Sequence, residues 1–468
     1  MFLSAPERAE FYRFLELLYN RVSRFSSRNG GKACHNVSGL FVHPAQNPVL
    51  QARFSMQYDR YFTNFRGHAM KFAGIIAEYD PFHNGHAWQL AQAKLLGAEH
   101  IAVAMSCSLV QRGALPLLPE AVRTRAALTC GADLVFALPA PCACAGAEAF
   151  ARAGVALLSA AGCDGLVFGA ETPDAALLME AAALLDSDAY RAALKAQLSG
   201  GAKSFAAARQ AAAAQLAPDG RVAALLDKPN NNLAVEYCRA IRCLAPQMEA
   251  HPLPRQGADH GEALHAAHGP FASASALRRL WAEGEADALA PYVPEAIFPL
   301  YREAYVAGQY TDFSVAGRCE LSLLRSACRG ETPFGQVRGI SEGLEHRLES
   351  AVRASTTYDG LLDALTTVRY PRARMRRLAM DAALGYAADS FPSLPPYLHL
   401  LGGRKDALPF LKGCSLPASH SLARLRESGE ACARMAEAQL AAADFGALCR
   451  VSPEAMGSLL RQKIIFLT

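Results

Sequence analysis

The chain has 468 residues, of which 51% are hydrophobic and 19% are charged, and its formal net charge is +4. This length is typical of two or three domains, and the composition is that of a globular protein with sizeable cores rather than of a disordered chain. No apolar run approaches the roughly 20 residues that span a membrane, and a net charge this small permits a nucleic-acid partner only where basic residues cluster. The 13 cysteines show neither paired CxxC motifs nor zinc-ligand spacing. We therefore expect a cytoplasmic protein with reduced cysteines, whose oligomeric state the sequence does not indicate.

Residues 1–69 differ in composition from the rest of the chain. They carry nine Lys/Arg against four Asp/Glu and many Phe and Tyr residues, whereas an alanine-rich composition begins after Met70. Glu7, Glu10 and Glu16 argue against a mitochondrial presequence, because such segments are poor in acidic residues. We expect an N-terminal extension without a function of its own, with Met70 as the natural start of the folded part.

From Met70 onward, short apolar strands alternate with helices. The predicted strands are 72–77, 101–105, 134–138 and 165–168, with a possible fifth at 248–253, and the predicted helices are 87–96, 121–130 and 146–160. Such alternation is typical of a parallel sheet that is covered by helices on both faces. Right-handed crossovers then give a doubly wound α/β domain, in which ligands bind beyond the carboxyl ends of the strands.

The stretch 70–89, MKFAGIIAEYDPFHNGHAWQ, places a polar turn between the first strand and the first helix. Pro81 ends the strand by fixing its own φ and by keeping the preceding residue out of the helical region. Unpaired N–H groups and the helix dipole make such a helix start an anion site. His83 and His86 can both face one phosphate group, and Gly85 lets a flat base or a phosphate approach the backbone. The simpler alternative is that the histidines merely cap a surface helix.

Two further loops follow strands at the same predicted edge, namely 105–113 (MSCSLVQRG) and 168–171 (FGAE). Their convergence with the histidine turn indicates one ligand site. Farther along, we expect 230–232 (NNN) to cap a helix that begins just after it, which leaves one or two amides for a ligand. The hydroxyl of Ser273 and the guanidinium of Arg278 could hold a polyphosphate, although Ser273 is equally suited to cap a helix.

From about residue 280 the chain has helix-like apolar spacing, notably over 343–354 and 358–368. The stretch 369–377, RYPRARMRR, carries five arginines and one tyrosine. Arginine forks beside an aromatic ring suit RNA phosphates and an unstacked base. A charge run of this kind is otherwise a solvated helix face, so both interpretations stay open at this point.

Ordered motifs along most of the chain carry a resemblance to a known family. They are GIIAEYDPFHNGH (74–86), MSCSLVQRG (105–113), RTRAALTCGADLVFALP (123–139), FGAE (168–171), KPNNNLAVEY (228–237), RQGADH (255–260), SASALR (273–278) and SEGLEHRL (341–348). With these motifs, the chain from Met70 to about Leu411 resembles the bacterial tRNA(Met) cytidine acetate ligases. The His-x-Gly-His turn resembles the signature of the HIGH-type nucleotidyltransferase superfamily.

The resemblance implies a Rossmann-like catalytic domain over 70–279 and a mainly α-helical, tRNA-binding domain over 280–468. It implies that ATP activates acetate as acetyl-adenylate, and that the wobble cytidine of elongator tRNA(Met) then becomes N4-acetylcytidine. His83, His86 and Arg278 would stabilise charge on the phosphates, and Mg²⁺ would accompany ATP without a dedicated protein cage. The implied ATP contacts are Ile76, Ala77, Glu78, Tyr79, Asp80, Pro81, Phe82, His83, Asn84, Gly85, His86, Ala87, Trp88, Gln89, Gly169, Asn230 and Arg255. The implied tRNA contacts are Arg369, Tyr370, Arg372, Arg374, Arg376 and Arg377.

The chain departs from the family pattern in three places. Asp80 stands where the family usually has Asn, Cys107-Ser108 where it has Gly-Asn, and Ala137 where it has Glu. A carboxylate at position 80 would repel ATP phosphates unless it holds Mg²⁺ or a ribose hydroxyl. The departures leave open whether acetate is the carboxylate. Two alternatives also stay open: an adenylyl transferase that acts on another small carboxylate or a cofactor precursor, and a non-catalytic RNA-binding relative.

Overall fold

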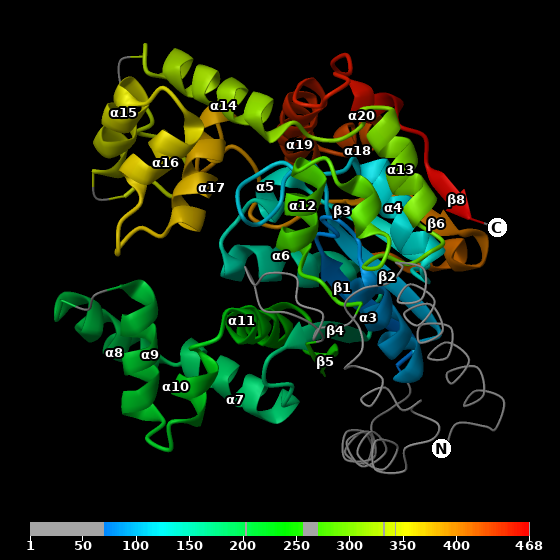
Figure 1. Cartoon of the computed structure of the whole chain (residues 1–468). Helices are drawn as coiled ribbons and strands as arrows, with labels where there is room; N and C mark the ends of the chain where they lie inside the picture. The colour runs from blue at the N-terminus through cyan, green and yellow to red at the C-terminus, as the bar shows by residue number, and fades with distance from the viewer. Residues whose placement is uncertain (1–69, 202–203, 256–269, 331–332, 342, 468) are drawn as a thin grey trace, which may run out of the picture. The chain divides into compact units, whose positions relative to one another are not determined.

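A mostly parallel sheet lies at the centre of the described part of the chain, which in this computed structural model comprises residues 70–201, 204–255, 270–330, 333–341 and 343–467. Its first five strands are β1 (Phe72–Ala77), β2 (His100–Ser106), β3 (Leu134–Leu138), β4 (Gly165–Ala170) and β5 (Glu249–Pro254). They follow the spatial order β5-β4-β1-β2-β3, and all their pairings are parallel (Figure 1). Nearly every residue of β1 to β4 is buried, as expected for strands covered on both faces. The five predicted strands are confirmed, and the bounds of β1 and β3 are as predicted.

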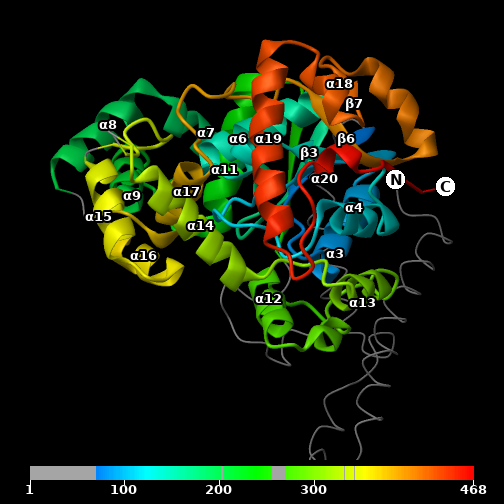
Figure 2. The same cartoon turned by 90° about the horizontal axis from the view of Figure 1, so that it is seen from above.

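Helices from the crossovers cover both faces of this sheet. The helices α3 (Asn84–Leu95) and α4 (Glu120–Thr129) lie on one face, and α6 (Ala147–Ala160) and α11 (Pro229–Leu244) lie on the other (Figures 1 and 2). A Cβ on Gly154 of α6 would lie 2.5 Å from the Ile76 side chain, so glycine lets this helix pack closely on β1. The expected doubly wound α/β domain is confirmed. The other helices before β5 are α5 (Ala140–Ala143), α7 (Ala175–Asp186), α8 (Asp188–Ser199), α9 (Phe205–Leu216) and α10 (Arg221–Leu225).

The C-terminal end of the chain returns to the sheet. Strand β6 (Leu398–Arg404) pairs antiparallel with β3, and both β7 (Ala418–Ser419) and β8 (Ile465–Leu467) pair with β6 in parallel. The sheet therefore includes three strands, β6, β7 and β8, from the part of the chain after residue 280 that was predicted to be mainly helical. The short apolar run in β6 does not distinguish a strand from a buried helix by periodicity alone, which is why these strands were not predicted. The remaining elements here are η4 (Lys405–Gly413), α18 (Leu422–Arg426), α19 (Glu430–Leu448), which crosses the view in Figure 2, and α20 (Ser458–Arg461).

Helices α14 (Phe313–Ala327), α15 (Leu344–Ala354), α16 (Tyr358–Leu365) and α17 (Arg372–Ala383) form a group with a small core of its own (Figure 1). Leu324, Leu348, Leu361 and Met375 are fully buried in this core. The group is connected to β5 through α12 (Ala274–Ala282), η3 (Ala286–Leu289) and α13 (Phe298–Val306). Among the described helices, none combines the length and the apolar character needed to cross a bilayer.

Some helix bounds differ from the predicted ones. Helix α3 begins at Asn84 instead of residue 87, because His83 caps it. Helix α11 begins at Pro229, which favours the first helical turn, so Asn230 lies inside the helix and the predicted asparagine cap is wrong. Helix α16 ends at Leu365 instead of residue 368. The predictions for residues 1–69 and most of the RQGADH motif concern residues outside the described part.

Candidate active site

Buried aromatic rings hold the turn that follows β1. Tyr79 and Phe82 are fully buried with ring centroids 4.8 Å apart, and the His86 ring contacts them at 4.9 and 5.5 Å. Tyr79 has a φ of 49°, a left-handed conformation that is rare for a bulky residue. The Tyr301 hydroxyl of α13 donates to Phe82 O at 2.8 Å. Packing around the turn thus overcomes the local backbone preference and fixes how the histidines are presented.

His83 and His86 form a capping box at the start of α3. The Gly85 N–H donates to His83 Nδ1 at 3.1 Å, and the His83 N–H donates to His86 Nδ1 at 3.2 Å. Because each Nδ1 is an acceptor, each neutral ring carries its proton on Nε2 and can donate from there. Burial, aided by the charge of Arg255, lowers the pKa of His83 to about 3 and holds the pKa of His86 well below its ordinary value. The stacked rings, 3.8 Å apart between centroids, are therefore two neutral hydrogen-bond donors.

Gly85 has a packing role inside this capping box. A Cβ at Gly85 would lie 2.9 Å from Cε1 of His83, so a side chain there would displace the imidazole. The His83 ring therefore requires a residue without a Cβ at position 85. The approach of a base or a phosphate to the Gly85 backbone stays a prediction.

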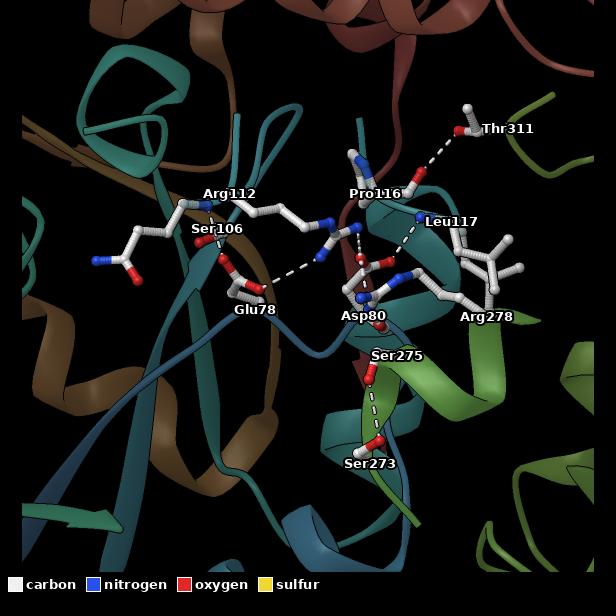
Figure 3. Close-up of polar contacts among 12 residues, drawn as sticks. Glu78, Asp80, Ser106, Arg112, Pro116, Leu117, Ser273, Ser275, Arg278 and Thr311 are labelled. Atoms are coloured by element: carbon white, nitrogen blue, oxygen red, sulfur yellow. Dashed lines mark hydrogen bonds and ion pairs between the residues drawn. The ribbon is translucent and has the colours of Figure 1, made fainter. Parts of the chain in front are cut away.

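Asp80 is almost fully buried between two arginines (Figure 3). Its carboxylate forms an ion pair with Arg112 and accepts from the Leu117 N–H at 2.5 Å. Arg278, which reaches in from α12, lies 3.4 Å from the carboxylate and also donates to Asp80 O. Burial alone would raise the pKa of Asp80, but the two arginines and the Leu117 N–H together hold it below its ordinary value. Asp80 is thus an ionised counter-charge for two arginines, and these offset the repulsion expected between a carboxylate and ATP phosphates.

Arg123 of α4 is fully buried and had no role in the sequence-based predictions. It donates to four main-chain carbonyls, those of Leu118 (2.9 Å), Glu78 (2.8 Å), Ser106 (2.6 Å) and Cys107 (2.5 Å). Three of these carbonyls lie at the ends of β1 and β2, so Arg123 ties together the two loops at the carboxyl edge of the sheet. An arginine among the apolar positions of the predicted helix was the signal that could have indicated this role.

The second half of the site forms where β4 and β5 end and α11 begins. The Glu171 carboxylate accepts from Asn230 Nδ2 at 2.6 Å and from the N–H groups of Asn230 and Asn231 at 3.1 and 2.6 Å. Glu171 therefore caps α11 from another segment. Arg255 donates to Asn230 Oδ1, and its side chain passes beside Gly169, where a Cβ would lie 3.5 Å from it. The predicted residues Gly169, Asn230 and Arg255 are thus brought together, although the Asn230 amide is already engaged.

Several other side chains of the predicted ATP-binding run have partners within the fold. Asn84 Nδ2 donates to the carbonyls of Pro270 and Pro291 at 2.9 and 3.0 Å. Gln89 Nε2 donates to Val167 O at 3.1 Å, and Trp88 packs against the main core. These side chains position the turn, which leaves the histidines and the arginines around them as the groups best suited to bind an anion.

The remaining departures from the family pattern lie in buried positions. Burial raises the pKa of the Cys107 thiol, which is therefore neutral. Ser108 Oγ donates to Glu120 Oε1 at 2.8 Å, and Ala137 is fully buried inside β3. Among the described residues, no group of three or more His, Cys, Asp or Glu side chains is placed to hold a metal ion. Because Glu78 accepts from the Gln111 N–H at 2.6 Å and lies 3.7 Å from Arg112, a Mg²⁺ ion at this site would be held mainly by phosphate oxygens and water.

The arginines of the stretch 369–377 do not form one uniform solvated face. Arg372 pairs with Asp363 and, at 2.7 Å, with Asp359 of α16. The guanidinium carbons of Arg374 and Arg369 lie 5.1 and 5.8 Å from the centroid of the Tyr370 ring. The six predicted tRNA contacts thus differ in the ion pairs and ring contacts that they make within the chain.

Helix α17 also contacts the loop that carries Arg112. Arg377 Nη1 donates to Gln111 O at 3.1 Å. Gly113 has a φ of 74°, and a Cβ there would lie 2.5 Å from the main-chain nitrogen of Arg377. Glycine is therefore required both by the backbone conformation and by the close approach of the helix. Through this contact the arginine stretch lies beside the loop that carries Arg112.

Comparisons with known proteins give matches over most of the chain. A family model described as HIGH nucleotidyl transferase matches residues 70–455. The chain is 34% identical over 369 residues to the tRNA(Met) cytidine acetate ligase of Syntrophotalea carbinolica, a match that covers 76% of this chain and 86% of the relative. It is 30% identical over 406 residues to the protein of the same name from Acetivibrio thermocellus, with 82% and 96% covered.

Solved structures of TmcAL from Thermotoga maritima have the same fold. The form bound with α-thio ATP has a TM-score of 0.76 and 25% identity, and the apo form has a TM-score of 0.78 and 26% identity. Each match covers 85% of this chain and 100% of the solved chain. Both halves of the site and helix α17 lie within the matched residues 70–455. The chain therefore belongs to the tRNA(Met) cytidine acetate ligase family of HIGH nucleotidyltransferases.

Proposed function

We propose that the protein activates acetate with ATP as acetyl-adenylate and then transfers the acetyl group to N4 of the wobble cytidine of elongator tRNA(Met). The observation that carries the proposal is the pair of neutral Nε2–H donors at His83 and His86, which lie near the charges of Arg255 and Arg278. Relatives that the chain matches over most of their length are named tRNA(Met) cytidine acetate ligase, and one solved relative holds α-thio ATP. The intact capping box argues against a non-catalytic RNA-binding relative.

In the first step an acetate oxygen attacks the α-phosphorus of ATP, and pyrophosphate leaves with the bonding electron pair. Negative charge moves onto the phosphate oxygens, where fixed donors stabilise the transition state more than the ground state. His83 and His86 serve this role without changing protonation state, since both are neutral in the folded protein. Arg278 adds a full positive charge, and Mg²⁺ bound to the nucleotide would supply further charge neutralisation.

In the second step the N4 amino group attacks the acetyl carbonyl carbon, and AMP is released. The helical group that carries Arg369, Tyr370, Arg374 and Arg376 would hold the RNA, because guanidinium groups and an aromatic ring suit phosphates and unstacked bases. Arg372 is less suited, since two aspartates already offset its charge. All described cysteines are free thiols, which fits a reaction in a reducing cytoplasm.

The test is ATP–pyrophosphate exchange with acetate and with other small carboxylates, followed by mass spectrometry of tRNA(Met) for N4-acetylcytidine. We expect exchange with acetate and one acetyl group on the wobble cytidine. Exchange that depends on a different carboxylate would favour the alternative of another adenylyl transfer. An absence of exchange with every carboxylate would refute the adenylation chemistry itself.

A further inference from the structure

A cavity of about 390 Å³, lined by both charged and apolar side chains, lies between the loop after β2 and the helices α12, α14, α16 and α17. Its volume is within the range of roughly 300–1,000 Å³ that small-molecule pockets occupy. Two residues of its lining, Arg112 and Arg278, are the arginines that bind Asp80 at the histidine turn. The cavity therefore reaches the phosphate-binding groups on one side and the arginine helix α17, through Arg376, on the other.

Glu320 of α14 lines this cavity with a carboxyl group that is only 3% exposed. The hydroxyl of Tyr358, which also lines the cavity, interacts with this carboxyl, but neither Glu320 Oε1 nor the hydroxyl has a partner at full hydrogen-bond distance in the described part of the chain. A buried oxygen without a full hydrogen bond costs roughly 1–3 kcal/mol, so a ligand that donates a hydrogen bond to Glu320 would offset this cost.

Close packing holds these two oxygens in place. A Cβ on Gly317, one turn before Glu320, would lie 3.0 Å from Cβ of Tyr358, so the glycine lets α16 approach α14. Burial raises the pKa of Glu320 to about 8, while Tyr358 and Arg376 oppose the rise. The carboxyl group can therefore gain and lose a proton near neutral pH, which is the range in which a proton acceptor is effective.

We propose that this cavity receives the target cytosine, splayed out of the anticodon, and that Glu320 accepts a hydrogen bond from its N4 amino group and then takes the N4 proton. The proposal rests on the proposed function and assigns the place where its second step occurs. Carboxylates are the side chains that accept from cytosine N4, and enzymes that modify a base draw it out of its stack into a pocket. Arg376 and Arg279 in the same lining suit the phosphates on either side of the nucleotide.

The chemical step balances with these groups alone. A bond forms between N4 and the acetyl carbonyl carbon, and the bond from that carbon to the phosphate oxygen of AMP breaks. AMP leaves with the electron pair, and the proton lost from N4 passes to the Glu320 carboxylate. Uracil presents a carbonyl oxygen where cytosine has its amino group, so the same carboxylate repels it.

The test compares both chemical steps in Glu320→Gln, a nearly isosteric change. Acetate-dependent pyrophosphate exchange should stay within about twofold of wild type, whereas single-turnover transfer to tRNA(Met) should fall at least about 100-fold, as for loss of a proton acceptor. The matched control is Glu349→Gln on α15, whose carboxylate pairs with Arg353 at the surface, and it should change neither rate. Wild-type transfer by Glu320→Gln would overturn the proposal, even if exchange confirms the adenylation step.

A second measurement keeps the proposal testable if Glu320→Gln fails to fold. With the wild-type protein, millimolar cytidine 5′-monophosphate should slow transfer to tRNA(Met) without slowing exchange, and uridine 5′-monophosphate should do neither. Equal inhibition by both nucleotides, or inhibition by neither, would refute a cytosine-selective cavity. Failure of wild-type exchange with acetate would instead refute the proposed function, so the two failures are distinguishable.

Discussion

His83→Asn separates the catalytic role of the first histidine from its structural role. In the folded protein His83 Nδ1 accepts from the Gly85 N–H as the cap of α3, and its Nε2–H is the donor that we assign to the phosphates. Asparagine is among the best helix caps, so it can replace the acceptor, but it places no donor where Nε2 lies. His83→Ala removes both functions at once and is therefore a less informative variant.

The two losses have different magnitudes. Loss of a cap costs roughly 1 kcal/mol of stability, which His83→Ala should show and His83→Asn should largely avoid. Loss of one donor to a developing charge costs about 3 kcal/mol in the transition state, or on the order of a hundredfold in rate. His86→Ala should combine a similar rate loss with a weaker capping box, since His86 Nδ1 accepts from the His83 N–H. We expect His83→Asn to melt like wild type and to lose about 99% of its exchange activity, as that factor implies.

Exchange rate, thermal unfolding and their pH dependence measure these effects. Because the pKa of His83 is lowered to about 3, the folded ring stays neutral from pH 8 to 6, and exchange should not fall there through its titration. The unfolded ring binds a proton below about pH 6.5, so stability should decrease as pH falls from 6.5 toward 3. Wild-type exchange by well-folded His83→Asn would show that His83 is only a cap, and a rate that rises as His83 gains a proton would refute the neutral-donor mechanism.

Three further predictions use the same two assays together with tRNA binding. A chain that begins at Met70 should melt and acetylate tRNA(Met) like the full chain, because it retains the Asp164 carboxylate that accepts from the N–H groups of residues 71 and 72 at 2.9 Å. A lower melting temperature or weaker tRNA binding would show that residues 1–69 contribute. Arg123→Met should cost at least about 3 kcal/mol of stability, since it leaves four carbonyls without their donor, and unchanged thermal unfolding would contradict this. Arg374→Ala should weaken tRNA binding and flatten its salt dependence while pyrophosphate exchange stays intact. Arg377→Ala should also slow exchange, because it removes the hydrogen bond to Gln111 O. Identical behaviour of the two variants would contradict this difference between Arg374 and Arg377.

The sheet was predictable from sequence because its strands are continuous apolar runs separated by helices. Such runs carry a strong local signal, and the structure confirms β1 and β3 to the residue. The return of β6 to pair with β3 was not predictable, since the pairing joins residues more than 260 positions apart, such as Leu134 and Gly403. Nothing local distinguishes an added edge strand from a buried helical turn of the same composition.

At the candidate site, the sequence indicated which loops come together but not the partners of their side chains. The turn, Arg278 and the group around Gly169 do come together, as ordered loops at one sheet edge led us to expect. The neutral state of the histidines depends on which ring nitrogen accepts a backbone N–H, and this is decided by the capping geometry. Likewise, Asp80 looked unfavourable beside phosphates because the sequence does not show that Arg112 and Arg278 converge on it.

The loop between β2 and α4 is held from three sides, and this bears on how the two chemical steps are coupled. Arg123 binds its first carbonyls, Asp80 binds the Leu117 N–H, and α17 packs on Gly113. Arg112 lies between these contacts, so a displacement of α17 by bound RNA would also move the Arg112 guanidinium. Interfaces of this kind transmit small shifts, since closely packed backbones do not deform continuously. RNA bound at α17 should therefore alter the rate of adenylation, and exchange measured with and without tRNA(Met) would detect it.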